Sequence, residues 1–358
     1  MSDATAGPAR ISVAVLGATG MVGQTFLRLL EGHPWFRVAE VAASERSAGK
    51  RYGDVVHWLE GQLPDSVANL PVLRCDPESV RAPIVFSALD AAAAGAVEPA
   101  FARSGRWVLS NARNFRLEPD VPLIIPEVNP DHLALLECQR ATRGWPGAIV
   151  TNANCSTMVV ALALAPLHHA FGVRTAMVTT LQAVSGAGYP GVASLDILGN
   201  VIPFIGGGEE EKIESETLKL LGRVENGVVE PAPIRISAQV NRVPVEHGHT
   251  VCLSVSLAEP VSPEAAVQAI EAWRSAVASL ALPSAPRQPV VVLPEADRPQ
   301  PRRDVERGGG MTVSIGRVRR CPVFDLRLVA LGHNTIRGAA GASVLNAELL
   351  VARGFVRA

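Results

Sequence analysis

The chain has few cysteines, and they follow no pattern. Its 358 residues contain only Cys75, Cys138, Cys155, Cys252 and Cys321. Their number is odd, they are widely spaced, and no pair has the Cys-x-x-Cys spacing that is typical of zinc or redox sites. The sequence therefore argues against a disulfide framework and predicts no metal site.

A strong net charge and a long apolar run are also missing. The formal net charge is -1 at pH 7, so the chain has no long-range attraction for nucleic-acid phosphates or anionic membranes. No apolar run approaches the roughly 20 residues that span a bilayer. The first ten residues include Asp3 and lack the apolar core of a signal peptide. We therefore expect a cytoplasmic protein that binds small molecules and neither nucleic acid nor membrane.

The first half of the chain alternates between strand-like and helical stretches. A hydrophobic content of 48% over 358 residues is enough for two cores. The buried strands that we predict are 11–16, 37–43, 84–88, 107–110, 123–125 and 148–151. Such alternation is typical of an α/β domain with a doubly wound parallel sheet. The sequence therefore predicts a Rossmann-type domain over residues 1–153.

The second half has a different character. A long helix from Cys155 is followed by a β-rich run, a glycine-rich loop, a charged helix and further strands, which predicts an α+β catalytic domain over 154–337. Residues 283–303 are rich in proline and arginine and are expected to form an irregular crossing loop. The last helix, within 338–358, should stop at Gly354 and complete the first domain.

The turn after the first strand has the composition of a dinucleotide site. Three glycines recur with GxxGxxG spacing between a strand and a leucine-rich helix. Glycines permit the tight turn and the close approach of backbone to a pyrophosphate, which the helix N-terminus also attracts. The residues predicted to bind the cofactor here are Gly17, Thr19, Gly20, Met21, Val22 and Gly23.

The end of the second strand bears on the choice of cofactor. It reads Ser44-Glu45-Arg46-Ser47, at the place where NADP-binding sites usually carry a basic residue for the 2′-phosphate. Arg46 favours NADP, and we predict that it binds with Ser44 and Ser47. Glu45 would oppose a dianion, and the alternative interpretation of Arg46 is a solvated loop charge.

Cys155 stands between a β-type run and an apolar helical run. A helix N-terminus offers unpaired N–H groups and a partial positive charge, which favour a thiolate and can hold an oxyanion beside it. The alternative is a small residue that merely packs at a helix start. The position predicts a nucleophile with half of an oxyanion hole in the same turn.

The chain resembles the aspartate-β-semialdehyde dehydrogenases of the archaeal and fungal type over nearly its whole length. The matching segments are 17–23, 110–116, 154–157, 181–191, 200–212, 242–250 and 333–338. The resemblance implies NADPH-dependent reduction of L-aspartyl-4-phosphate to L-aspartate 4-semialdehyde and phosphate, a reversible step toward lysine, threonine and methionine. It also implies a homodimer or homotetramer, with 154–337 as the dimerisation domain.

The resemblance assigns catalytic roles to three residues. Cys155 would take the acyl group as a thioester, and Gln182 would orient that group beside it. His249 would transfer protons near neutral pH. The nearby rival is His247, but the family places its catalytic histidine seven positions after an arginine, which is Arg242 here. For the other histidines, a structural or solvated role is expected.

The resemblance also assigns the substrate and nicotinamide subsites. Arg242 would bind the α-carboxylate, and one acid of the Glu209-Glu210-Glu211 run would bind the ammonium group. Which of the three acids does so stays open, and the run could instead be a solvated helix start. The predicted substrate-binding residues are Arg116, Asn154, Glu209, Lys212 and Arg242, with Arg116 and Lys212 on the phosphate. Ser185, Gly186 and Asn334 would line the nicotinamide half of the cofactor site.

Other activities use the same scaffold. N-acetyl-γ-glutamyl-phosphate reductases and glyceraldehyde-3-phosphate dehydrogenases carry Gly-Cys-Tyr-Pro and Ser-Cys-Thr-Thr around their cysteine, whereas this chain has Asn154-Cys155-Ser156-Thr157. A malonyl-CoA reductase is harder to distinguish and remains the alternative activity. A dinucleotide-binding sensor without catalysis would not need Cys155, His249 and Arg242 together.

Overall fold

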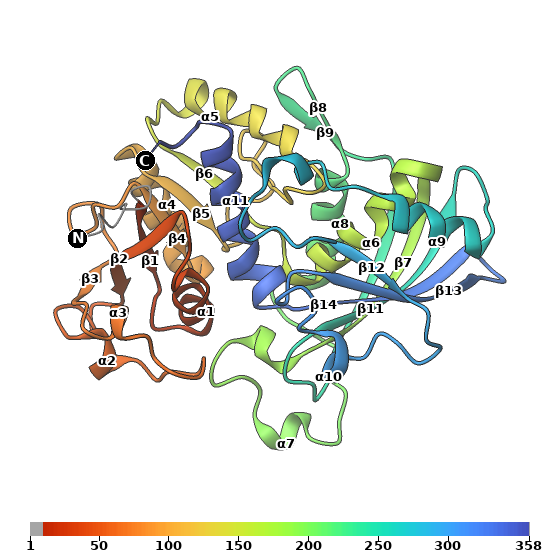
Figure 1. Cartoon of the computed structure of the whole chain (residues 1–358), viewed down its shortest axis with the longest axis horizontal. Helices are drawn as coiled ribbons and strands as arrows, with labels where there is room; N and C mark the ends of the chain where they lie inside the picture. The colour runs from red at the N-terminus through yellow and green to blue at the C-terminus, as the bar shows by residue number, and fades with distance from the viewer. Residues whose placement is uncertain (1–9, 358) are drawn as a thin grey trace, which may run out of the picture.

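The computed structural model describes residues 10–357, so residues 1–9, which were assessed above for a signal peptide, lie outside it. Two large sheets lie side by side, the first built from the N-terminal half of the chain and the second from the C-terminal half (Figure 1). Within the described residues, no helix has the length and apolarity needed to cross a membrane.

The first sheet has six parallel strands in the order β3-β2-β1-β4-β5-β6. They are β1 (Ile11–Leu16), β2 (Phe36–Ala43), β3 (Val72–Arg74), β4 (Ile84–Ser87), β5 (Trp107–Ser110) and β6 (Ala148–Thr151). The helices of this half are α1 (Met21–Leu30), α2 (Tyr52–Val55), α3 (Asp65–Ala68), α4 (Ala91–Arg103), the 3-10 turn η1 (Pro130–Ala134) and α5 (Leu135–Arg143). The strand order reverses beside β1, which is where doubly wound sheets bind their ligands. The predicted Rossmann-type fold is therefore confirmed.

Two details of this sheet differ from the sequence prediction. Residues 123–125, predicted as a strand, form only a single bridge from Leu123 to Thr151. All three are fully buried, so their apolar character reports burial in the core and not a place in the sheet. The sixth strand is instead β3, whose three residues are too few to show an alternating pattern.

The second sheet is mixed and has the order β10-β7-β11-β14-β13-β12. Its strands are β7 (Val173–Gln182), β10 (Arg235–Arg242), β11 (His249–Leu257), β12 (Val290–Leu293), β13 (Val313–Arg320) and β14 (Leu326–Gly332), and β8 (Arg223–Glu225) pairs separately with β9 (Val228–Glu230). The region also contains α6 (Cys155–Phe171), η2 (Val184–Ala187), α7 (Ser194–Ile197), α8 (Glu209–Leu220), α9 (Pro263–Ala272), η3 (Ala278–Leu280) and α10 (Pro301–Asp304). The expectation of one irregular loop over 283–303 was wrong, because β12 and α10 lie within it.

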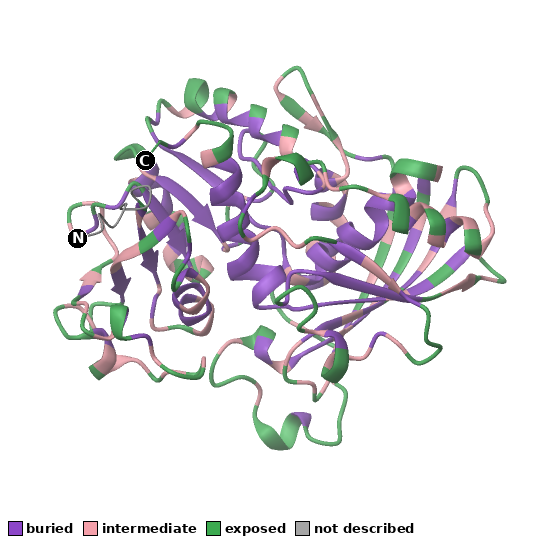
Figure 2. Cartoon of the chain, in the orientation of Figure 1, coloured by how far each residue is buried: buried purple, intermediate pink, exposed green. Residues whose placement is uncertain are grey.

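One face of the mixed sheet is covered by helices, and the other is open in the monomer. The apolar helix α6 packs on β7, β11 and β14, flanked by α8 and α9. On the opposite face, Met177 is 46% exposed and Cys252 is also exposed. Figure 2 accordingly shows alternating buried and exposed residues along these strands, whereas the strands of the first sheet are mostly buried.

The chain ends in a buried helix that returns to the first sheet. A π-helical turn, η4 (Ile336–Ala340), leads into α11 (Gly341–Ala352), which contacts α1 and β5. Leu345 and Leu349 share one apolar core with Phe26 and Leu109. Gly354 follows with φ of 76°, a left-handed conformation that suits glycine and ends the helix.

Candidate active site

The helix that carries Cys155 begins directly after the last parallel strand, where the two sheets meet. Asn154 is its N-cap, and the Oδ1 atom accepts hydrogen bonds from the backbone N–H groups of Ser156 and Thr157. This contact satisfies two of the donors that a helix start leaves free. The cap therefore fixes the first turn of α6, and with it the position of the thiol.

Cys155 faces a histidine from the mixed sheet. The Sγ atom lies 3.2 Å from Nε2 of His249, the first residue of β11, which is fully buried. The backbone N–H of Ala183 donates to Nδ1 of the same ring over 3.1 Å. Nδ1 must then be an acceptor, so the neutral ring carries its proton on Nε2 and directs it at the sulfur. The imidazole is thus arranged as a hydrogen-bond donor toward Cys155.

The ionisation of this pair differs from the sequence prediction. Burial, with a smaller effect of the Glu209 charge, raises the pKa of the Cys155 thiol to about 12, against the lowering effects of Arg116 and Arg242. Burial also lowers the pKa of His249 to about 3, with help from the positive charge of Arg242. The helix start was expected to favour a thiolate, but loss of hydration at the buried sulfur opposes the helix field and outweighs it. Cys155 and His249 rest as a neutral thiol and imidazole.

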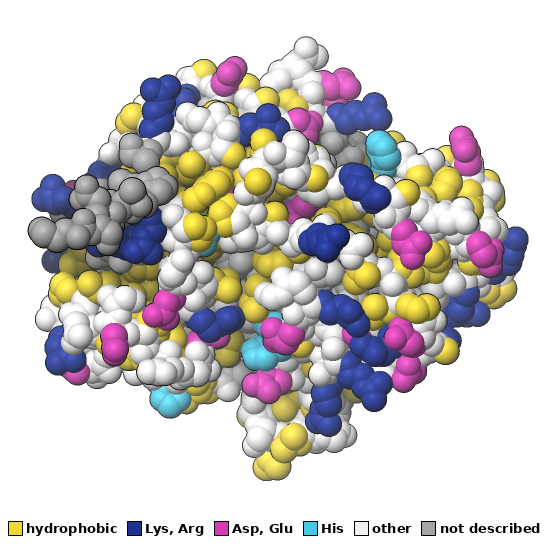
Figure 3. All heavy atoms as spheres, in the orientation of Figure 1, with side chains coloured by type: hydrophobic (Ala, Val, Ile, Leu, Met, Phe, Trp, Pro, Cys, Tyr) yellow, Lys and Arg dark blue, Asp and Glu magenta, His cyan; other side chains and the backbone are white. Residues whose placement is uncertain are grey.

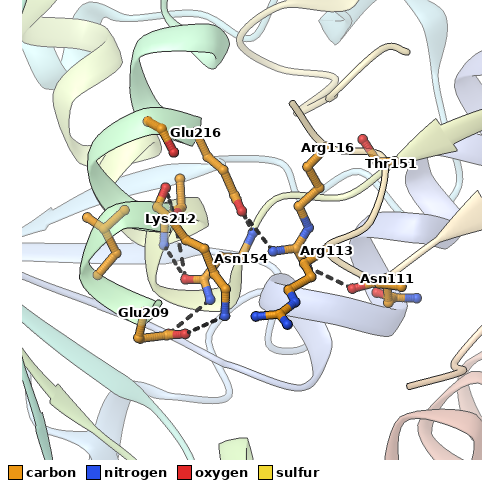
Figure 4. A network of polar contacts seen from close by, with 12 residues as sticks. Asn111, Arg113, Arg116, Thr151, Asn154, Glu209, Lys212 and Glu216 are labelled. Carbon is orange, nitrogen blue, oxygen red and sulfur yellow. Dashed lines mark hydrogen bonds and ion pairs between the residues drawn. The ribbon is translucent and has the colours of Figure 1, made fainter. Parts of the chain in front are cut away.

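A glutamate from α8 connects several polar groups of the site, among them the Asn154 and Lys212 side chains drawn in Figure 4. Glu209 accepts hydrogen bonds at Oε1 from Asn154 Nδ2 (2.9 Å) and Gln182 Nε2 (3.3 Å). Its Oε2 pairs with Lys212 Nζ at 3.3 Å, one helical turn away. Glu210 instead accepts from the backbone N–H of Val240. Of the three consecutive acids, Glu209 is thus the one whose carboxylate joins this network.

Arg242 is the last residue of β10. Its Nη1 donates to the carbonyl oxygen of Ala183 over 2.8 Å, and the residue is 7% exposed. A Cβ added to Gly186 would lie 2.9 Å from that Nη1 atom and 3.2 Å from His249 Nε2. A glycine at position 186 therefore leaves room for the side chains of Arg242 and His249. The sequence motif alone does not explain why a glycine is needed there.

Arg116 enters the site from the loop after β5, held by a residue that the sequence analysis missed. Its Nη1 donates to Glu216 Oε1 over 2.9 Å, and Nη2 donates to the Asn111 carbonyl over 2.7 Å. Glu216 Oε2 accepts from the backbone N–H of Asn154 over 2.6 Å. One buried carboxylate thus ties Arg116 to the residue before the nucleophile. In sequence it is an unremarkable acid on a charged helix.

Arg113 was also missed and lies beside these groups. Its guanidinium donates from Nη1 to the Gly207 carbonyl over 2.9 Å and is exposed. Nη1 of Arg113 and Nζ of Lys212 are each 3.6 Å from the position of a Cβ at Gly207. Two cations, both labelled in Figure 4, therefore lie close to the same glycine of this loop.

A cavity of about 800 Å³ lies at the switch point of the first sheet. Its lining includes Gly17, Thr19, Gly20, Met21, Val22, Ser44, Glu45, Arg74, Gly188 and Tyr189. Gly17 has φ of 70°, and a Cβ there would lie 2.6 Å from the Ala88 carbonyl. A Cβ at Gly23 would lie 2.3 Å from the Gly17 carbonyl. These glycines therefore fit the tight turn that a dinucleotide pyrophosphate needs.

Of the residues predicted to bind the 2′-phosphate, only Ser44 lines that cavity. Ser44 and Glu45 line it, but Arg46 and Ser47 do not belong to its lining. Arg74, at the end of the neighbouring strand β3, does, and its guanidinium pairs with Glu45 at 3.3 Å. Arg74 could not be found from the sequence, because its proximity depends on the pairing of β2 with β3.

The predicted nicotinamide residues Ser185 and Asn334 come together from two distant segments and contact residues 247–248. Asn334 Nδ2 donates to Ser185 Oγ over 2.8 Å, and its Oδ1 accepts from the Gly248 backbone N–H over 2.9 Å. His247 Nδ1 lies 3.0 Å from the same Ser185 hydroxyl. The rings of His247 and His333 stack with centroids 5.1 Å apart. His247 thus supports this wall and does not contact the sulfur.

Charge outside the site is mixed. Figure 3 shows both acidic and basic side chains spread over the face that it displays. In the described part of the chain, no group of three or more His, Cys, Asp or Glu side chains is arranged to hold a metal ion.

The fold and the thiol–imidazole pair define a class, the dinucleotide-dependent oxidoreductases with a cysteine nucleophile. Residues 12–136 match the family model "Semialdehyde dehydrogenase, NAD binding domain", and residues 164–337 match "Semialdehyde dehydrogenase, dimerisation domain". On this evidence, and on the relatives described next, the chain belongs to the aspartate-semialdehyde dehydrogenase family.

Curated relatives and solved structures agree with this placement. The chain is 51% identical over 343 residues to the aspartate-semialdehyde dehydrogenase of Archaeoglobus fulgidus, covering 96% of this chain and 98% of the relative. It is 48% identical to that of Cryptococcus neoformans, over 97% and 99% of the two chains. The crystal structure of the Candida albicans enzyme with NADP superimposes with a TM-score of 0.89 at 43% identity, covering 97% and 100%.

Proposed function

We propose that this enzyme catalyses the reversible, NADPH-dependent reduction of L-aspartyl-4-phosphate to L-aspartate 4-semialdehyde and phosphate. The observation that carries the proposal is the 3.2 Å contact between Cys155 Sγ and His249 Nε2, at a helix start that is surrounded by acidic and basic side chains. The named relatives support the same reaction, and none of the relatives described above is a malonyl-CoA reductase.

In the proposed first step, Cys155 Sγ attacks the acyl carbon of the aspartyl phosphate. The C–S bond forms as the C–O bond to phosphorus breaks, and the thiol proton leaves with the phosphate, giving a thioester and hydrogen phosphate. Gln182 lies at the strand end nearest the network and is proposed to orient the acyl oxygen. The Asn154 side chain and carbonyl accept the N–H groups of residues 156–158, so the N–H of Cys155 itself is the donor of this turn that is proposed to face a developing oxyanion.

A bound nicotinamide cofactor supplies the hydride that reduces the acyl carbon. As the resulting thiohemiacetal collapses to the aldehyde, the C–S bond breaks and its electron pair stays on Cys155 Sγ, where His249 Nε2–H donates a hydrogen bond to the thiolate. Burial of His249 keeps its resting ring neutral, so the proton that returns Cys155 to the thiol is taken up from solvent in each turnover, and the ring is proposed to pass it to the sulfur as a transient imidazolium.

Charge complementarity supports the substrate assignment. We propose that Arg242 binds the α-carboxylate through the guanidinium nitrogens that remain free beside its contact with Ala183. Glu209 is proposed to bind the ammonium group, as the acid whose carboxylate faces the site. Lys212 and Arg116 are proposed to hold the phosphate, with the exposed Arg113 as a third cation.

We propose NADP as the cofactor. The residues at the glycine turn, at the end of β2 and at the nicotinamide wall are proposed contacts: Gly17, Thr19, Gly20, Met21, Val22, Gly23, Ser44, Arg46, Ser47, Ser185, Gly186 and Asn334. The cavity at the switch point and the NADP complex of the Candida relative support this choice. Arg74 competes with Arg46 for the 2′-phosphate, because it is the arginine that lines the cavity.

We further propose a homodimer or homotetramer formed through the open face of the mixed sheet. The family model over 164–337 is a dimerisation domain, and the exposed Met177 on that face supports a partner there. The five cysteines are free, which fits the reducing cytoplasm. The division into domains 1–153 with 338–358 and 154–337 is part of the same proposal. Sedimentation of the purified protein measures its oligomer size.

The activity is tested by following NADP⁺ reduction with aspartate semialdehyde in the presence and absence of phosphate, beside malonate semialdehyde with CoA. The proposal predicts turnover that needs phosphate and aspartate semialdehyde. Turnover that needs malonate semialdehyde and CoA instead would identify the malonyl-CoA reductase activity and overturn it.

A further inference from the structure

A buried carboxyl group that the mechanism does not use lies behind the phosphate subsite. Glu98 belongs to α4 and is fully buried at the carboxyl ends of β4 and β5. Its Oε1 accepts a hydrogen bond from Ser110 Oγ over 2.8 Å. Its Oε2 atom and the hydroxyl of Ser87 lie close enough for the hydroxyl to act on the carboxyl, but neither atom makes a hydrogen bond of normal geometry in the structure. Burial of an incompletely satisfied carboxyl is costly, so its presence calls for a reason.

Glu98 is connected to the loop that carries Arg113 and Arg116. Ser110, the last residue of β5, donates its hydroxyl proton to Glu98 and accepts the backbone N–H of Ala112 over 3.1 Å. The first residues of the loop are therefore held by a relay that ends on the buried carboxyl. Arg116 Nη2 in turn donates to the carbonyl of Asn111, which lies between the two.

An ionised Glu98 interacts electrostatically with Arg116. The hydroxyls of Ser87 from β4 and Ser110 from β5 face the carboxyl, and Arg116 is the charged side chain that acts on it. Burial raises the pKa of Glu98 to about 7, although both hydroxyls and Arg116 lower it. Near neutral pH the carboxyl is therefore divided between its neutral and ionised forms, and ionisation places a negative charge behind a site meant for an anion.

We propose that Glu98 is a positioning residue for the phosphate subsite, holding residues 111–116 through Ser110, and that its neutral form is the one that favours phosphate binding. This rests on the proposed role of Arg116 in binding phosphate. By linkage, bound phosphate must favour the protonated carboxyl to the same extent that the protonated carboxyl favours phosphate.

The test uses Glu98→Gln, which keeps an acceptor for Ser110 and offers an N–H to the free Ser87 hydroxyl, but cannot ionise. KM for phosphate is measured for the wild type and this variant from pH 6 to pH 8. Because phosphate itself titrates in this range, the ratio of the two KM values is compared. We expect a ratio near 1 at about pH 6 that rises to at least about threefold at about pH 8, with KM for aspartate semialdehyde unchanged.

Two further variants separate positioning from packing. Ser110→Ala breaks the relay and should raise KM for phosphate by roughly tenfold at every pH, the effect of losing one hydrogen bond, while kcat changes less than KM. Glu137→Gln removes an exposed carboxylate of α5 and should leave every constant unchanged.

A wild-type to Glu98→Gln ratio that stays flat across the pH range would show that Glu98 only packs, and would overturn the proposal. This outcome is distinct from failure of the proposed function. If Arg116→Lys leaves KM for phosphate unchanged, or if the wild type turns over without phosphate, the assignment of the subsite itself is wrong.

Discussion

Gly338 lies directly against the nucleophile, and adding one methyl group there should displace it. A Cβ at this position would be 2.6 Å from Cys155 Cβ and 2.9 Å from its Cα. Carbon atoms pack at about 3.5–4.0 Å, so the two must separate by about 1 Å. The neighbouring Arg337 is fully buried and paired with Glu127 at 2.7 and 2.8 Å, so this segment cannot easily yield.

The cost of Gly338→Ala follows from that displacement. A shift of about 1 Å would stretch the 3.2 Å contact between Cys155 and His249 beyond productive range. Misplacement of this size costs about 10²-fold in rate, and overpacking costs about 1–3 kcal/mol of stability. We expect kcat of Gly338→Ala to fall by roughly that factor in the phosphate-dependent assay, with thermal unfolding measured in parallel.

Gly341→Ala is the matched control. A Cβ there would be as crowded, at 2.6 Å from Met311 Sδ, but its neighbours belong to the core and not to the thiol. It should lose stability while keeping most of its kcat. A Gly338→Ala enzyme with kcat within about threefold of wild type would refute the reasoning.

Five further substitutions test individual roles. His249→Asn should lower kcat by about 10²–10⁴-fold and His247→Asn by less than about tenfold, and exchanged outcomes would reverse the assignment. Arg242→Lys should raise KM for aspartate semialdehyde by at least about tenfold, because lysine cannot form the two-pronged carboxylate contact; a raised KM for phosphate alone would place Arg242 in another subsite. Arg46→Ala should remove most of an NADP preference of roughly 10- to 150-fold, whereas loss of that preference only in Arg74→Ala would assign the 2′-phosphate to Arg74.

Much of the fold could be predicted because its signals are local. The glycine turn, the strands of the first sheet and the helix start at Cys155 each depend on neighbours in sequence. Residues 123–125 were misassigned because burial gives a short run the same composition as a strand. β12 was missed inside a proline-rich stretch, since four apolar residues at a sheet edge carry little periodic signal.

The candidate site was predictable where a motif existed and not where contacts alone decide the role. Glu216 holds Arg116 and Asn154, but its position 62 residues from Asn154 gives no sign of this. Glu98 likewise resembles any acid of an alanine-rich helix. The thiol pKa was misjudged because the helix start is visible in sequence, whereas the burial that outweighs it is not.

The central claim is a covalent acyl-enzyme at Cys155, and mass spectrometry tests it most directly. Wild-type enzyme is mixed with aspartate semialdehyde and NADP⁺ without phosphate, so that hydride transfer can occur but the thioester has no phosphate to accept the acyl group. We predict one equivalent of NADPH per active site and an aspartyl adduct on the peptide containing Cys155, which disappears when phosphate is added and never forms in Cys155→Ser. NADPH formation with no adduct on that peptide, or with an equal adduct in Cys155→Ser, would contradict the account.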